Sequence, residues 1–153
     1  MSARGAVLLA AGLVLASCGS PYSGNTLGQQ VTSWARSTGL AGSLSALRGD
    51  AARIAVVEAR GAPAAVRTDC DVLVNDALSA NQNLPAPDDP LTRILSAAYS
   101  AAAAAGKRCV EGAGGSRGLS ARSTAELATA ASGYVKAEAR LDALGATDSG
   151  SSS

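Results

Sequence analysis

The chain has 153 residues, 13 Lys and Arg against 12 Asp and Glu, and no histidine. This length allows one domain at most, and the near-neutral charge gives no electrostatic basis for binding nucleic acid. The absence of an imidazole removes the usual general base of a serine hydrolase and most metal-site templates. We therefore predict a protein that is not an enzyme, with no catalytic residue, no metal and no cofactor.

The N-terminal segment has the pattern of a targeting signal. One cation, Arg4, precedes an eleven-residue run of Gly, Ala, Val and Leu at residues 5–15. That length suits the apolar region of a signal peptide and is too short to cross a hydrocarbon core of about 30 Å. The next residues, Leu15-Ala16-Ser17-Cys18, resemble the lipobox of bacterial lipoproteins. The resemblance implies cleavage before Cys18 and a diacylglyceryl group on its thiol. The alternative is an ordinary secretory signal, cut after Ala16 or Ser17.

The lipobox reading sets the expected domain organisation and localisation. We predict a signal peptide at 1–17, a lipidated N-terminus and tether at 18–25, a helical bundle at 26–146 and a disordered tail at 147–153. Two or more acyl chains would hold the protein stably, since each buried methylene contributes about 0.8 kcal/mol. The predicted localisation is therefore the extracytoplasmic face of the cell membrane, with the membrane reached through the lipid on Cys18.

Two further cysteines, Cys70 and Cys109, are predicted to form a disulfide. Outside the cytoplasm a lone pair of cysteines is most simply a disulfide, and two thiolates without histidine make a poor metal site. In the chain-entropy model, closing a loop of about 40 residues stabilises by roughly 4 kcal/mol. For a core without Phe, built from Ala, Leu and Val, that is a large share of the total.

Apolar residues recur at helical spacing along most of the mature chain, and no segment alternates with the period of a strand. The fold class predicted is all-α, a small antiparallel helical bundle of about four helices with one disulfide. The stripe that starts at Leu27 lies on a different face from the one that starts at Leu40, so the first helix is expected to break near Thr38-Gly39. The other helices are expected from Pro63, from Pro90 with Asp89 as its N-cap, and from Ser120 or Ser123.

The position of Cys109 poses a problem of register. If the third helix ended at Ser79 and paired antiparallel with the next, Cys70 would face about residue 99. The difference of ten residues corresponds to about 15 Å of helix, too far for a disulfide. We therefore predict that the third helix continues to about Asn83, or that the chain folds back after Gly106.

Few residues are candidates for function. The sequence Gly114-Gly115-Ser116-Arg117-Gly118 matches a hydrolase nucleophile elbow, but that motif needs a preceding strand and a histidine, so we interpret it as a loop. Trp34, Pro85 and Pro87 are nominated as a partner surface, although Trp34 also shares the apolar stripe of Val31. The function expected is a non-catalytic envelope lipoprotein that binds a protein or a cell-wall component. The alternative is an extracytoplasmic carrier of a small apolar ligand between the helices.

A second resemblance covers about 40 residues. The segment from Thr68 to Cys109 is similar to small, uncharacterised, secreted actinobacterial helical proteins. The similarity lies in Asp69-Cys70, Asn83-Leu84-Pro85, Pro87-Asp88, Leu91-Thr92, Ala98-Tyr99 and Cys109. It implies a shared scaffold and supplies no activity.

Overall fold

The computed structural model describes residues 25–113 and 119–146, and within these ranges it contains five helices and no strand. The helices are α1 (Leu27–Ser37), α2 (Leu40–Ala59), α3 (Pro63–Asn81), α4 (Asp89–Gly112) and α5 (Ala121–Ala143). The predicted all-α bundle with one disulfide is confirmed.

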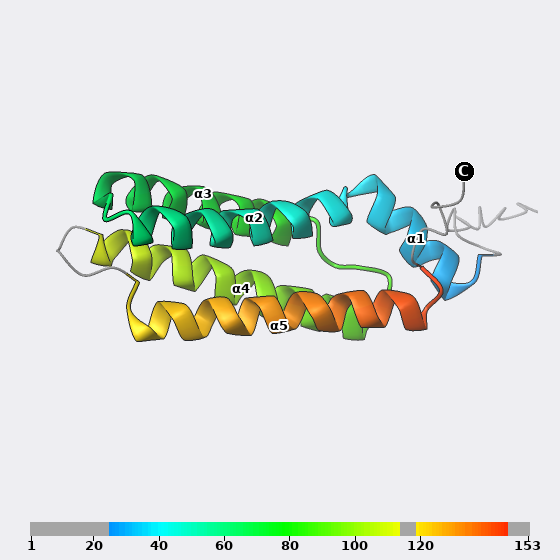
Figure 1. The fold of residues 1–153 in the computed structure, drawn as a ribbon. Coiled ribbons are helices and arrows are strands. Elements are labelled where there is room, and N and C mark those ends of the chain that lie inside the picture. Colours follow the sequence, from blue (N-terminus) through cyan, green and yellow to red (C-terminus); the bar gives the residue numbers. More distant parts are fainter. Residues whose placement is uncertain (1–24, 114–118, 147–153) are drawn as a thin grey trace, which may run out of the picture.

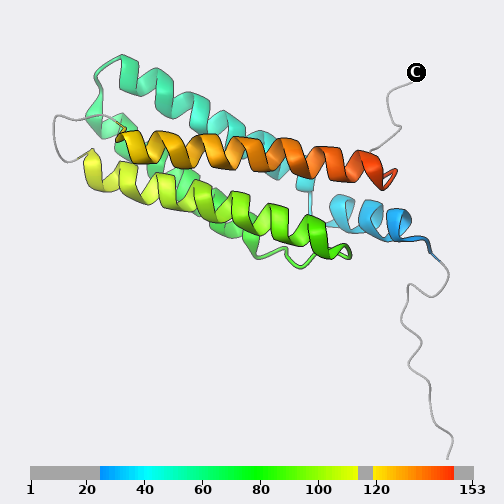
Figure 2. The same ribbon diagram turned by 90° about the horizontal axis from the view of Figure 1, so that it is seen from below.

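Four long helices, α2 to α5, run antiparallel to their neighbours in chain order, and the short α1 lies at one end of the bundle (Figures 1 and 2). This end also holds the start of α4 and the C-terminal end of α5, whereas the α2–α3 turn lies at the other (Figure 1).

Local sequence explains where the first helices begin and end. Thr26 caps α1 in a capping box, in which its hydroxyl accepts from the Gln29 amide and the Gln29 side chain accepts from the Thr26 amide. Gly39 then adopts a φ of 64°, a left-handed conformation that glycine tolerates and other residues rarely do. The predicted break between the first two helices near Thr38-Gly39 is confirmed.

The core consists largely of the apolar stripes expected from the sequence, with small residues prominent in α4 and α5. Large side chains such as Leu47, Leu73 and Leu95 are fully buried, whereas Leu27, the first residue of the expected α1 stripe, is 42% exposed. The buried set on α4 is Leu91, Leu95, Ala98, Tyr99, Ala102, Ala103, Ala105, Gly106 and Cys109. Because so many of these side chains are small, helices can approach closely along α4.

Several glycines mark close approaches between elements: Gly28 of α1 packs against the Leu144 carbonyl oxygen after α5, and Gly133 and Gly106 lie at contacts between long helices. A Cβ on Gly133 of α5 would lie 2.6 Å from the Ala98 Cβ of α4, and one on Gly106 would lie 2.6 Å from the Val74 Cγ2 of α3. Neither Gly133 nor Gly106 could carry a side chain without moving a helix, so the α3–α4–α5 spacing depends on them.

The disulfide forms between α3 and α4, with 5.9 Å between the two Cα atoms. The helix α3 runs past Ser79 to Asn81, and turn hydrogen bonds continue through Asn83, in agreement with the expected continuation. The alternative of a fold-back after Gly106 is wrong, because α4 is continuous to Gly112.

The loop between α3 and α4 accounts for the remaining displacement that places Cys109 opposite Cys70. Eleven residues separate Cys70 from the end of α3, but twenty separate the start of α4 from Cys109. The nine-residue difference is about 14 Å of helix. The loop 82–88 spans this distance because it runs along the bundle rather than turning tightly (Figure 1). Seven extended residues can span up to about 23 Å.

The start of α4 differs by one residue from the prediction. The N-cap is Asp88, whose carboxylate accepts a hydrogen bond of 2.8 Å from the Leu91 amide, while Asp89 and Pro90 lie in the first turn. Proline is tolerated throughout the first turn, where amides have no helical partner, so its position alone could not fix the cap.

Candidate interaction surface

The sequence-predicted site residues have different outcomes. Cys18 and the Gly114–Gly118 motif lie outside the described residues. Cys70 and Cys109 are bonded to each other and buried in the core. Trp34, Pro85 and Pro87 lie at the α1 end of the bundle.

Trp34 is brought against the loop that contains the two prolines. Its indole Nε1 donates a hydrogen bond of 3.2 Å to the Asn83 carbonyl, and its ring packs half-buried against the core. Pro85 and Pro87 are exposed, while Ala86 between them is buried. Trp34 thus links α1 to the loop through a hydrogen bond, and the two prolines are exposed to solvent.

The same loop is fastened to α5 by a charged contact that spacing did not reveal. The Arg140 guanidinium donates to both oxygens of the buried Asp88 carboxylate, over 3.0 and 2.7 Å. Hydrogen bonds from Arg140, with a further one from the Leu91 amide, hold the pKa of Asp88 below its usual value. Asp88 therefore caps α4 and links the loop to α5.

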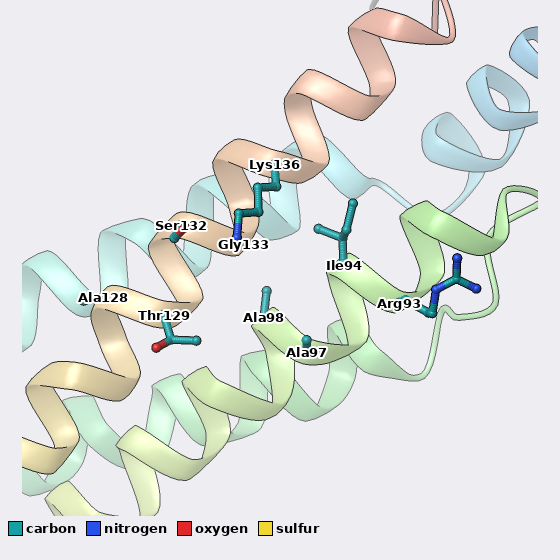
Figure 3. Close-up of a pocket in the computed structure, with 9 residues that line it drawn as sticks. All are labelled: Arg93, Ile94, Ala97, Ala98, Ala128, Thr129, Ser132, Gly133 and Lys136. Carbon is teal, nitrogen blue, oxygen red and sulfur yellow. The ribbon is translucent and has the colours of Figure 1, made fainter.

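An open groove lies between α4 and α5, with a volume of about 640 Å3 (Figure 3). Ile94, Ala97 and Ala98 line it from α4, and α5 contributes Ala128, Thr129, Ser132 and Gly133. Small side chains on both walls, together with the close contact of Gly133 and Ala98, leave this hollow unfilled. Its floor is mostly apolar.

Both charged residues of the groove are cations, Arg93 on α4 and Lys136 on α5 (Figure 3). Neither makes a hydrogen bond or ion pair with any residue that the structure describes. Arg93 acts only through space, by lowering the pKa of Asp88, whose oxygens are already bonded to Arg140. The groove therefore presents two cations that form no direct ion pair with another described residue, beside an apolar floor.

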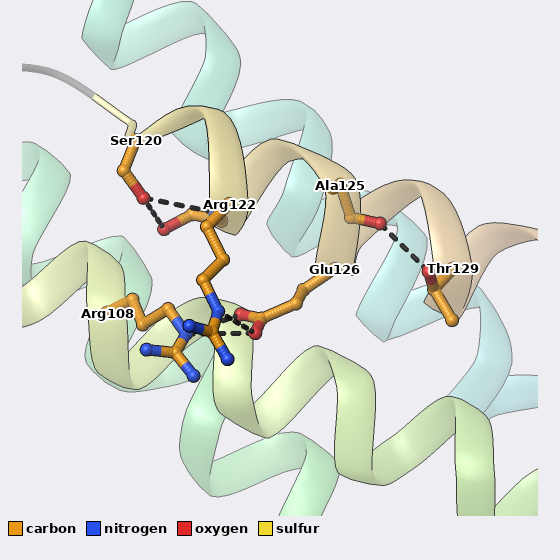
Figure 4. Close-up of polar contacts among 7 residues, drawn as sticks. Arg108, Ser120, Arg122, Ala125, Glu126 and Thr129 are labelled. Atoms are coloured by element: carbon orange, nitrogen blue, oxygen red, sulfur yellow. Dashed lines mark hydrogen bonds and ion pairs between the residues drawn. The ribbon is translucent and has the colours of Figure 1, made fainter.

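Beyond the groove, toward the start of α5, the contacts between α4 and α5 become ionic. Glu126 accepts from the Arg108 Nε at 2.9 and 3.0 Å, and the Arg122 Nε lies 3.5 Å from it (Figure 4). Ser120 caps the helix by accepting from the Ser123 amide. Ser120, one of the two expected helix starts, is therefore the N-cap, and Glu126 pairs with arginine rather than completing a capping box.

Other hollows are smaller or differently lined. An open hollow of about 440 Å3 lies where α1, α2 and α5 meet, beside Arg36, Leu40 and Glu138. A less open hollow of about 140 Å3 lies between helices, beside Leu47, Leu73 and Tyr134. Pockets that hold small ligands commonly measure about 300–1,000 Å3, so this hollow is small for such a ligand.

The described residues hold no cluster of three or more histidine, cysteine or acidic side chains that could bind a metal ion. None of their helices combines the length and the hydropathy needed to cross a membrane.

Comparison of the chain with protein-family models, with curated proteins and with solved structures gave no match.

Sequence reasoning missed the cations of the groove and the Asp88–Arg140 contact. The sequence did not predict that Arg93 and Lys136 line one groove, because Arg93 lies 43 positions earlier, on another helix. Asp88 carried a signal as a helix-cap residue next to proline, but its partner comes from α5, 52 positions away.

Proposed function

We propose that this protein is a membrane-anchored, non-catalytic envelope lipoprotein whose helical domain binds an acidic segment of an envelope protein in the α4–α5 groove. The single observation that carries the binding site is the pair of cations, Arg93 and Lys136, that form no direct ion pair with another described residue and lie beside an apolar floor. Carboxylates of a partner would pair with the cations, and its small apolar side chains would cover Ala97, Ala98 and Ile94. A cell-wall polymer could satisfy the cations but would make less use of the apolar floor.

The anchor in this proposal rests on the sequence. The lipobox-like Leu15-Ala16-Ser17-Cys18 precedes only seven residues, Gly19 to Asn25, before the cap of α1. A flexible segment of that length has an end-to-end distance of roughly 15 Å. The groove would then lie along the side of a bundle held close to the membrane, within reach of other envelope proteins.

The alternative of a carrier for a small apolar ligand has less support. The least open hollow has a volume of only about 140 Å3, which is small for such a ligand, and the larger hollows are open to solvent. The most exposed large apolar side chains, Leu27, Val56, Leu78 and Val135, lie on four different helices. These four residues therefore do not define a partner surface, and the groove is the better candidate.

The proposal predicts a charge-dependent interaction in intact cells. We would crosslink the anchored protein in its host, purify it and compare the wild type with Arg93→Glu and Lys136→Glu. The captured envelope protein should fall at least threefold in each variant, because like charges repel the acidic segment. Mass spectrometry of the same sample should show cleavage before Cys18 and a diacylglyceryl group on it.

The matched control is Arg67→Glu, the same charge reversal on an exposed position of α3. It should leave capture unchanged. Equal capture by all variants would refute the groove as the binding surface, and retention on cell-wall material alone would replace the protein partner by a polymer. An unmodified Cys18, or a mature chain that begins elsewhere, would refute the anchor independently of the groove.

A further inference from the structure

The two cations of the α4–α5 groove lie at the same end of it. The two helices are antiparallel, and Gly133 of α5 lies against Ala98 of α4. Arg93 comes five residues before Ala98, and Lys136 comes three residues after Gly133. Because the helices run in opposite directions, these offsets of about 7.5 Å and about 4.5 Å both point toward the α1 end (Figures 1 and 3).

A stripe of mostly small residues runs along the α5 wall of the groove. It has the alternating four- and three-residue spacing of a coiled-coil seam. All of its members are exposed, and they are Ala121, Ala125, Ala128, Ser132, Val135 and Ala139. Ala128 and Ser132 also line the groove, and the apolar Val135 is 62% exposed. The core residues of α5, such as Ala130 and Tyr134, lie on the other side of the helix, so this stripe is a second face that no helix of the described chain covers.

The walls of the groove suit a helix better than an extended chain. The main-chain groups of α4 and α5 are bonded within each helix, and the Thr129 hydroxyl donates to the Ala125 carbonyl at 2.9 Å (Figure 4). An extended segment pairs its main chain with a neighbouring strand, and two helical walls offer no such edge. A helix satisfies its own main chain, and small wall residues let its axis come within about 8–10 Å of a neighbouring helix.

The placement of the cations selects the direction of such a helix. The C-terminal end of a helix carries a partial negative charge and carbonyl oxygens without helical partners, whereas its N-terminal end is partly positive. Arg93 and Lys136 therefore favour the C-terminal end, and both side chains can donate to its free carbonyls. Acidic side chains in that last turn add full negative charges beside the two cations.

We propose that the acidic segment bound in the groove is an α-helix that runs parallel to α5, with its C-terminal turn at Arg93 and Lys136. Small residues of this helix pack against the exposed stripe of α5 at the shallow angle of coiled-coil packing, about 20°. This orientation rests on the proposed function, which supplies the acidic partner, and adds the conformation and the direction of the bound segment.

The test places a photo-crosslinking amino acid at Ala128 or at Ala139 of the full-length protein in its host, one position at a time. Both are exposed alanines of the α5 stripe, eleven residues or about 16 Å apart along the helix. Mass spectrometry then identifies the partner residue that is crosslinked from each position. We expect the two residues to belong to one envelope protein and to lie about 11 positions apart, because a parallel helix has the same rise per residue as α5. The residue crosslinked from Ala128 should be the one nearer the N-terminus of that protein.

Failure of the orientation and failure of the groove give different results. A separation of about five positions would show an extended segment, and a reversed order would show a helix antiparallel to α5. Either result would overturn the proposed helix and its direction while leaving the groove as the binding surface. The matched control is Ala64, an exposed alanine on α3, which should not crosslink the same protein. Equal crosslinking from Ala64, or no envelope protein crosslinked from either α5 position, would refute the groove as a partner site and the bound helix with it.

Discussion

At the scale of single residues, the loop between α3 and α4 depends on Asp88. This residue satisfies an orphan amide of the α4 first turn and accepts two hydrogen bonds from Arg140 of α5. It is 4% exposed, so both sets of bonds are shielded from water. A residue chosen locally as a helix cap thereby acquires a tertiary role.

Replacement of Asp88 by Ala should lower the free energy of unfolding by about 2–3 kcal/mol, since it removes a helix cap and a charged hydrogen-bonded contact. Because the folded pKa of Asp88 lies below its usual value, the lost stability is present above about pH 4 and disappears on acidification. Urea unfolding near neutral pH and in acid measures both effects.

Asp88→Asn is the matched control, because the amide oxygen can still accept from the Leu91 amide. A smaller loss in Asp88→Asn than in Asp88→Ala would assign the difference to the bonds that Oδ1 accepts from the Leu91 amide and the Arg140 Nε. If neither variant differed from the wild type, the contact between the loop and α5 would contribute nothing to stability.

At the scale of helices, the packing depends on small residues at defined positions. Alanine is normally favoured over glycine in a helix by about 1 kcal/mol. At Gly133 the extra methyl would meet Ala98 of α4, whereas at Gly42 on α2 nothing lies within 4 Å. The same substitution should thus have opposite effects at the two positions.

We expect Gly133→Ala to destabilise the bundle by about 1–3 kcal/mol through overpacking, and Gly42→Ala to stabilise it by about 0.5–1 kcal/mol. Thermal unfolding of the two variants beside the wild type tests this. A stabilising Gly133→Ala would show that α4 and α5 can separate at little cost and would contradict the close contact.

At the scale of the whole molecule, the bundle depends on one covalent link across a core of small side chains. The link joins two helices that are consecutive in the chain yet displaced along the bundle by the loop 82–88. In the unfolded chain it closes a loop between residues 39 positions apart. We therefore expect the disulfide to stabilise the fold mainly by restricting the conformations of the unfolded chain.

Removal of the disulfide in the Cys70→Ala, Cys109→Ala double variant should reduce the free energy of unfolding by about 3–4 kcal/mol. Alanine is preferred to serine because both positions are buried and a hydroxyl would lack a partner there. Urea unfolding of the variant, with reduced wild type as control, gives the value. A loss below about 1 kcal/mol would mean that the Ala-rich core is sufficient by itself.

Much of the fold could be predicted because it depends on neighbours in sequence. The apolar stripes at Leu44, Leu73 and Tyr134 have helical spacing, and the two cysteines fall on buried faces of adjacent helices. Gly39 signalled the break between the first two helices, since few other residues accept its left-handed conformation.

The candidate surface depended on the tertiary structure. Arg93 and Lys136 line one groove, and Asp88 pairs with Arg140, only after separate helices take their register. That register depends on a loop that runs along the bundle and on glycines at the helix contacts. The spacing of apolar residues in the sequence predicts neither feature. Helical spacing determines which face of a segment is buried, but charges on different helices become partners only through the relative displacement of those helices.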